Sequence, residues 1–83
     1  MERGSTRVEK ATRWIGDKFA GIEWHVYRMG HLTDYPIGAV HCDRGTWYAL
    51  DNSGKRLPAP GCKTRRAAIF TLCKFDDHNA LPN

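Results

Sequence analysis

The sequence predicts an α+β fold with the element order α-β-β-β-α, in which a three-stranded antiparallel sheet is packed by two helices. Apolar residues recur at helical spacing near both ends of the chain, and between these segments they alternate with polar residues as in strands. The chain of 83 residues has room for one small domain, 1–83. Residues 1–5 and 77–83 are expected to be frayed tails.

The first predicted helix covers about residues 7–20. Thr6 and Glu9 have the spacing of a capping box, which marks a helix start. Apolar side chains then recur three or four residues apart, at Val8, Ala11, Ile15 and Phe19. Gly21 supplies a left-handed stop. The segment therefore has a start signal, a helical apolar face and an end signal.

Three strands are predicted in the middle of the chain. Residues 22–28 alternate between apolar and polar side chains, and 30–36 form a loop. Two short β-rich segments, 37–42 and 46–51, flank the sequence Asp-Arg-Gly at 43–45. This composition is typical of a three-residue hairpin loop with glycine in the left-handed conformation, so these two strands should be antiparallel neighbours.

The second predicted helix begins after a stiff connection, 57–61, which holds two prolines. Thr64 is the expected N-cap, and the helix should continue to about residue 75. Its apolar face is formed by Ala68, Ile69, Leu72, Cys73 and Phe75. The three tryptophans, Trp14, Trp24 and Trp47, are expected to supply much of the core.

Composition narrows the function only slightly. The net charge is +4, and most of the excess lies in a basic run that no acidic residue interrupts, formed by Lys55, Arg56, Lys63, Arg65 and Arg66. Such a balance mildly favours polyanionic partners. No apolar segment is long enough to cross a bilayer and the start lacks a secretory signal, so a cytoplasmic protein is expected. Three cysteines without paired spacing fit a reducing compartment.

The basic residues at the start of the second helix are the feature least explained by folding. Cations in a first helical turn are mildly unfavourable, but beside free backbone N–H groups they form a ready phosphate site. The alternative is a solvated basic turn. We take as candidate nucleic-acid contacts Lys55, Arg56, Lys63, Arg65 and Arg66, with support from Arg7, Lys10 and Arg13.

The predicted element order and the run Lys-Thr-Arg-Arg-Ala-Ala at 63–68 resemble the double-stranded-RNA-binding domain. In that family the basic residues opening the second helix contact phosphates across the major groove. The resemblance implies this role for Lys63, Arg65 and Arg66. The final lysine of the family's pattern is replaced by Ile69, and a longer stretch around His31 stands where the family has a short loop with a histidine.

A second resemblance covers more of the chain. The sequence Gly-Thr-Trp-Tyr-Ala-Leu-Asp at 45–51, then Gly54, then Thr-Arg-Arg-Ala-Ala at 64–68 is similar to small accessory proteins of actinobacterial phages and mobile elements. This resemblance implies binding to a host protein or to nucleic acid. Binding and modulation of a host protein, with or without homodimer formation through a strand edge, is therefore the alternative function.

No catalytic, metal or cofactor site is predicted. The histidines and cysteines lack a Cys-x-x-Cys motif, and the adjacent His41 and Cys42 should point to opposite faces of a strand. Fragments of a nucleophilic site exist at Cys42, Cys73, His41, His78 and Asp76, without a motif that joins them. Tyr27 and Tyr48, if exposed beside the sheet, would suit a protein interface.

Overall fold

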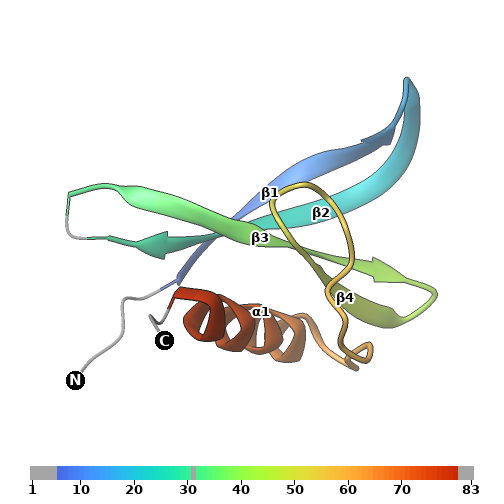
Figure 1. Cartoon of the computed structure of the whole chain (residues 1–83). Helices are drawn as coiled ribbons and strands as arrows, with labels where there is room; N and C mark the ends of the chain where they lie inside the picture. The colour runs from blue at the N-terminus through green and yellow to red at the C-terminus, as the bar shows by residue number, and fades with distance from the viewer. Residues whose placement is uncertain (1–5, 31, 81–83) are drawn as a thin grey trace.

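The computed structural model describes residues 6–30 and 32–80, and it contains four strands followed by one helix (Figure 1). The strands form a single antiparallel sheet in the order β1-β2-β3-β4. The elements are β1 (Thr6–Ile15), β2 (Lys18–Met29), β3 (Asp34–Asp43), β4 (Thr46–Leu50) and α1 (Arg65–Ala80). The predicted order α-β-β-β-α is therefore wrong, because the first element is a strand.

The segment predicted as the first helix forms β1 and its turn into β2. Ile15 lies opposite Lys18, so the turn has two residues, and its first residue, Gly16, has a φ of 64°. A positive φ at this position is what a type II′ hairpin requires. The apolar residues of β1 lie three or four apart by chance, and pairing with β2 along the whole strand outweighs the local helical signals.

The other strands contain the predicted ones and extend them. The segment 22–28 lies within β2, 37–42 within β3, and most of 46–51 within β4. The turn between β3 and β4 is shorter than expected, since Asp43 pairs directly with Thr46. Its two residues, Arg44 and Gly45, have φ of 54° and 81°, as in a type I′ turn.

The helix α1 starts where the sequence predicts. The backbone N–H of Ala67 donates to Thr64 Oγ1 over 3.1 Å, which makes Thr64 the N-cap. The helix continues to Ala80 rather than ending near residue 75, so 77–80 are helical. The predicted tails at 1–5 and 81–83 lie outside the described residues. Within the described ranges, no helix is long and apolar enough to span a membrane.

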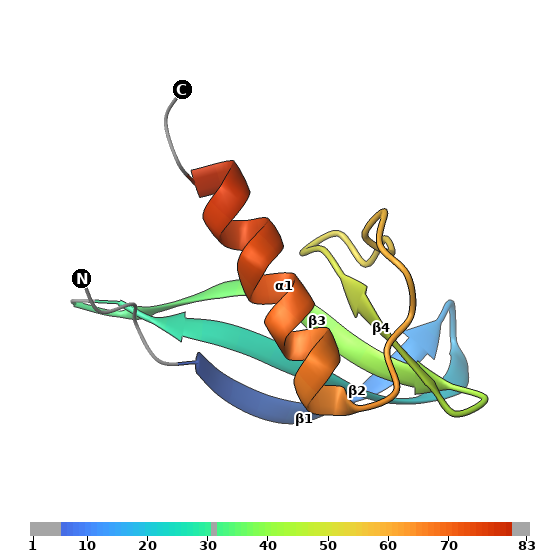
Figure 2. The ribbon, with the colours of Figure 1, turned by 90° about the horizontal axis from the view of Figure 1, so that it is seen from below.

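The core lies between α1 and one face of the sheet, across β3 and β4 (Figure 2). Its buried side chains come from the sheet, the connection and the helix: Val26, Ile37, Val40, Ala49, Leu57, Ala68 and Leu72. Trp24 and Trp47 are partly buried against this cluster. Trp14 does not contribute, because it is 58% exposed near the β1–β2 turn. The prediction of three core tryptophans is therefore wrong for Trp14.

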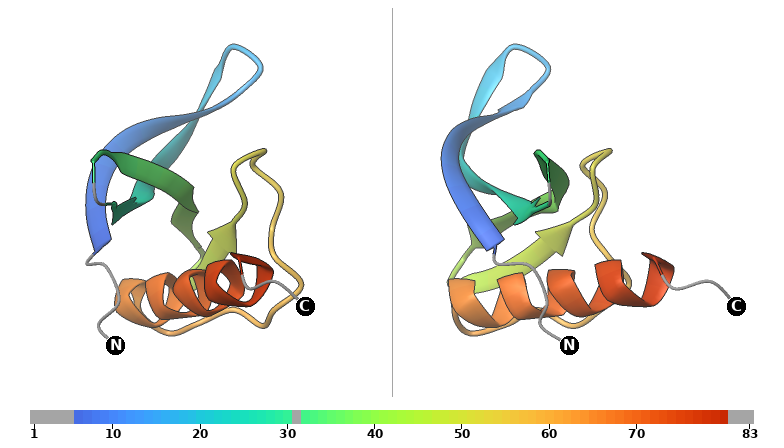
Figure 3. Two further views of the ribbon diagram at one scale, coloured as in Figure 1. Left: turned by 60° about the vertical axis from the view of Figure 1, so that its left-hand side comes forward. Right: turned by 90° about the vertical axis from the view of Figure 1, so that its left-hand side faces the viewer.

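The connection between β4 and α1 closes one edge of the sheet. The Leu57 N–H donates to Ala49 O over 2.9 Å, and Trp47 and Cys62 exchange two backbone hydrogen bonds of 2.8 Å each. The β1–β2 hairpin lies at the other end of the sheet and curves away from α1 (Figure 3). Among the described residues, the outer edge of β1 has no such cover.

Candidate nucleic-acid interface

The two faces of the sheet differ in charge because side chains alternate along each strand. Lys10, Trp24, Val40 and Ala49 form one cross-strand row, and Val40 and Ala49 belong to the core under α1. The acidic residues of the strands all lie on the other face, at Glu9, Glu23, Asp34 and Asp43. The face that carries α1 therefore has no acidic strand residue.

Basic side chains gather around Trp24, where α1 begins. The Arg65 guanidinium lies 4.3 Å from the centre of the Trp24 ring, and Lys10 Nζ lies 5.8 Å from the same centre. Both are cation–π distances, so the indole draws the two cations to one place from α1 and β1. Lys63 and Arg66 are exposed at the same end of α1, two residues before and one residue after Arg65 in the chain. We call Lys10, Lys63, Arg65 and Arg66 the α1 basic surface.

The α1 basic surface has no neutralising partner in the part of the chain that the structure describes. Its four side chains make no ion pair there, and the first turn of α1 contains no acidic residue. The N-terminal end of the helix dipole adds partial positive charge. An anion at this place would meet cationic side chains and backbone N–H groups together.

Lys55 and Arg56 do not join this surface. The Arg56 guanidinium lies 3.7 Å from the centre of the Tyr48 ring and 3.4 Å from Asp43 Oδ2. Tyr48 pairs with His41, on the opposite side of the sheet from Trp24. The five basic residues that the sequence groups together are thus divided between two faces.

Arg7 and Arg13 also lie on the sheet face opposite α1, which carries the acidic strand residues and which we call the acidic face. Arg7 Nε donates to Asp34 over 2.8 Å and its guanidinium also pairs with Glu9. The hydrogen bonds to Asp34 and Glu9 raise the pKa of Arg7 above its ordinary value. Arg13 pairs with Glu23 over 3.3 Å. Of the three supporting residues predicted, only Lys10 lies beside Arg65.

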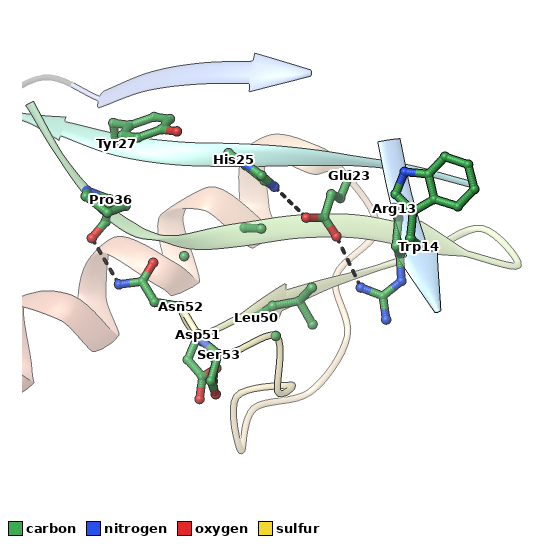
Figure 4. A pocket seen from close by; sticks show the side chains of 13 residues that line it. Arg13, Trp14, Glu23, His25, Tyr27, Pro36, Leu50, Asp51, Asn52 and Ser53 are labelled. Carbon is green, nitrogen blue, oxygen red and sulfur yellow. Dashed lines mark hydrogen bonds and ion pairs between the residues drawn. The ribbon is translucent and has the colours of Figure 1, made fainter. Parts of the chain in front are cut away.

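A groove of about 730 Å³, lined by both polar and apolar side chains, lies on the acidic face (Figure 4). At its centre Glu23 contacts both Arg13 and the imidazole of His25, with His25 Nε2 at 2.5 Å from Glu23 Oε2. Ser53, in the turn that borders the groove, donates its hydroxyl to Asp51 over 2.7 Å. Acids and bases are paired with each other here, so the groove offers no concentrated charge to a polyanion.

His41 is buried beside this groove and is only 6% exposed. Its Nε2 has no hydrogen-bond partner among the described residues. Burial lowers the pKa of His41, and the nearby charges of Arg13 and Arg56 lower it further. The imidazole is therefore neutral at pH 7.

The remaining candidate residues are the two interface tyrosines, His41 and the cysteines. Tyr27 lies under Arg7, whose guanidinium is 4.4 Å from the ring centre, so both candidate interface tyrosines are half-buried beneath arginines. His41 and Cys42 occupy successive positions of β3 and face opposite sides. The cysteines are free, and no cluster of three metal-ligating side chains occurs in the described ranges.

Comparisons with protein families, with curated proteins and with solved structures give no match. The resemblance to the double-stranded-RNA-binding domain loses its topology, because β1 replaces the first helix. The basic run at 63–68 stays at the start of α1, as the resemblance implies. Sequence reasoning missed Trp24 as the partner of Arg65, since a contact between β2 and α1 leaves no local signal.

Proposed function

We propose that the protein is a non-enzymatic module that binds a nucleic-acid backbone through the α1 basic surface. The observation that carries the proposal is the convergence of Arg65 and Lys10 on the Trp24 ring, on a side of the sheet without acidic strand residues. The indole holds the guanidinium of Arg65 in one orientation, which reduces the entropy lost when it binds. A guanidinium can contact a phosphate through two parallel hydrogen bonds, as it also contacts a carboxylate.

Each side chain of the surface has a role in the proposal. Arg65 supplies the oriented phosphate contact, and Lys10, Lys63 and Arg66 supply positive charge around it. Arg56, Arg7 and Arg13 are left out, because each would first have to leave a carboxylate. Lys55 is left out because it belongs to the turn that directly precedes Arg56. The site is thus smaller than the sequence suggests and lies on one side of the sheet.

The proposal places the protein in the cytoplasm. Its support is the state of Cys42, Cys62 and Cys73, which are all free. Free thiols persist in reducing compartments, where nucleic acids are also found.

A protein partner is the second candidate function, and the β1–β2 turn favours it. Trp14 and Phe19 are 58% and 64% exposed, and their rings meet edge to face with centres 6.1 Å apart. This turn extends beyond the body of the molecule (Figure 1). Exposed aromatic pairs of this kind are enriched at protein interfaces. Changing Trp14→Ser with Phe19→Ser should abolish capture of a host protein and leave nucleic-acid binding intact.

Binding of the purified chain to labelled duplex RNA, duplex DNA and single strands at several salt concentrations tests the proposal. Micromolar or tighter binding is expected to weaken steeply with salt. Contacts from all four cations would give a slope of about −3 to −4 in log K against log salt on duplex DNA. Absence of binding at low salt, or a flat salt dependence, would overturn the proposal.

A further inference from the structure

The outer edge of β1 is a second surface, which the proposed function does not use. At the opposite edge of the sheet, residues 56–62 run along β4 and form hydrogen bonds with the backbone of Trp47 and Ala49. Within the described residues, β1 pairs only with β2. A row of unpaired N–H and C=O groups therefore follows Thr6–Ile15, and such a row is a template for another strand.

The charge pattern of β1 favours pairing with a second copy of the same strand. Arg7, Glu9, Ala11 and Arg13 face the same side of the sheet. When a second copy of β1 lies antiparallel with Ala11 opposite its own counterpart, Glu9 lies opposite Arg13 of the second copy, and the reverse pair forms as well. These pairs would add to the contacts that Glu9 makes with Arg7, and Arg13 with Glu23, within each copy. Lys10 then lies opposite Thr12. No like charges are directly opposed, and the two strands overlap over 7–15.

The neighbouring registers lack this complementarity. With Lys10 opposite its own counterpart, Arg7 lies opposite Arg13 and the two lysines oppose each other. With Thr12 at the centre, the overlap shortens to 9–15 and no opposite charges meet. A register centred on Val8 joins Arg7 to Glu9 but overlaps only over 6–10. Directly opposed charges stabilise or destabilise antiparallel pairs according to their sign, so the Ala11 register is favoured.

We propose that the protein forms a homodimer in which two β1 strands pair antiparallel with Ala11 at the twofold axis. The pairing joins two four-stranded sheets into one and removes the free edge from both copies. Because the axis is perpendicular to the sheet, both α1 helices lie on the same face of the joined sheet. The dimer does not depend on nucleic-acid binding, but it would place two α1 basic surfaces on one side.

Sedimentation equilibrium of the full chain without nucleic acid tests the dimer. The wild type should be dimeric at high micromolar concentration. Arg13→Glu opposes Glu9 to a carboxylate, and Glu9→Arg opposes Arg13 to a guanidinium, so each should weaken dimerisation about tenfold or more. The double variant Glu9→Arg with Arg13→Glu should recover most of the wild-type affinity. Lys74→Glu, at an exposed position of α1, which packs on β3 and β4, is the charge control and should not change it.

A second measurement leaves the charges of β1 untouched. Ala11→Cys should oxidise to a covalent dimer through the two introduced cysteines, because they face each other at the axis. Ile15→Cys is the control, since its two copies would lie about 26 Å apart along the strands. The wild type, with its own three cysteines, is oxidised in parallel.

Preferential crosslinking of Ala11→Cys supports the proposed register. Equal crosslinking of the two cysteine variants, or none, would overturn it. A monomeric wild type, or an Arg13→Glu variant that folds and dimerises as tightly as the wild type, would overturn the dimer itself.

Discussion

The Arg65 guanidinium lies 4.3 Å from the centre of the Trp24 ring, which joins the start of α1 to the middle of β2. The contact fixes a cation on the side of the sheet where the strands carry no acid. Cations are unfavourable at the N-terminal end of a helix, and the first turn of α1 contains no acidic residue that would compensate for them. The cation–π contact with Trp24 offsets part of this cost for Arg65. The proposed binding function therefore depends on Trp24, a side chain that also packs against the core.

Removing the indole should weaken nucleic-acid binding without removing any charge. Trp24→Leu takes away the surface that orients Arg65, and a cation–π contact of about 0.5–1 kcal/mol corresponds to a loss of about two- to fivefold in affinity. Trp47→Leu, half-buried on the same face of β4, is the control and should bind as the wild type does. Equal losses in the two variants would indicate a general effect on folding.

The helix is expected to depend on Leu72 for its attachment to the sheet. Leu72 is 1% exposed and belongs to the core cluster, so Leu72→Ala should lower the free energy of unfolding by about 2–5 kcal/mol. Phe70 lies in the same helix but is 62% exposed, and Phe70→Ala should cost far less. Urea unfolding followed by circular dichroism measures both. Similar losses for the two variants would contradict the helix orientation.

Gly38 of β3 lies against both the end of β4 and α1. Its φ is 146°, and a Cβ there would lie 2.1 Å from Leu50 O and 2.9 Å from Leu72 Cδ1. Gly38→Ala should therefore destabilise the protein severely, through both the clash and the backbone strain. Gly16→Ala adds a Cβ to open space at a φ of 64° and should cost only about 1–2 kcal/mol. Thermal unfolding of the two variants compares these costs, and a milder effect at Gly38 would contradict the packing described.

Stability should fall when the pH drops below about 6.5 because of His41. Burial, and then Arg13 and Arg56, lower the pKa of His41 in the folded state from its ordinary 6.5. As the pH falls through 6.5, the unfolded chain gains a proton that the folded chain does not accept, so the equilibrium shifts toward unfolding. The melting temperature of the wild type should decrease between pH 7 and pH 5.5.

His41→Gln removes this titration and should reduce the decrease over the same interval. Above pH 7 the two proteins should respond to pH in parallel, because His41 is neutral in both states there. An identical decrease below pH 7 in the two proteins would show that His41 is not its source.

The sequence predicted the later part of the fold better than the beginning. Thr64 was recognised as the cap of α1 because N-capping is a local interaction. The β3–β4 hairpin was likewise predicted from its turn composition. The prediction of a helix over about residues 7–20 was wrong, because the Thr6–Glu9 spacing and the apolar residues three or four apart resemble the pattern of a helix. The Gly16 turn, which favours a hairpin, was not recognised from the sequence.

The composition of the candidate site was also hard to predict from local sequence signals. Which basic residues share a surface follows from strand alternation and from long-range contacts. Once β1 is a strand, Arg7 and Arg13 fall on the same side as Glu9 and Glu23, and only Lys10 falls beside Trp24. The separation of Arg56 from Arg65 depends on how residues 51–64 fold back along β4, for which no sequence rule exists.

Two paired double variants test whether nucleic acid binds at the α1 basic surface. Arg65→Ala with Arg66→Ala removes two cations from the α1 basic surface, and Lys55→Ala with Arg56→Ala removes two from the opposite side. Both lower the net charge equally, so affinity for a labelled duplex at several salt concentrations separates position from charge. The first variant should lose about tenfold or more in affinity, with its salt slope reduced by about two, while the second should stay near the wild type. Equal losses in both variants, or a larger loss in the second, would contradict it.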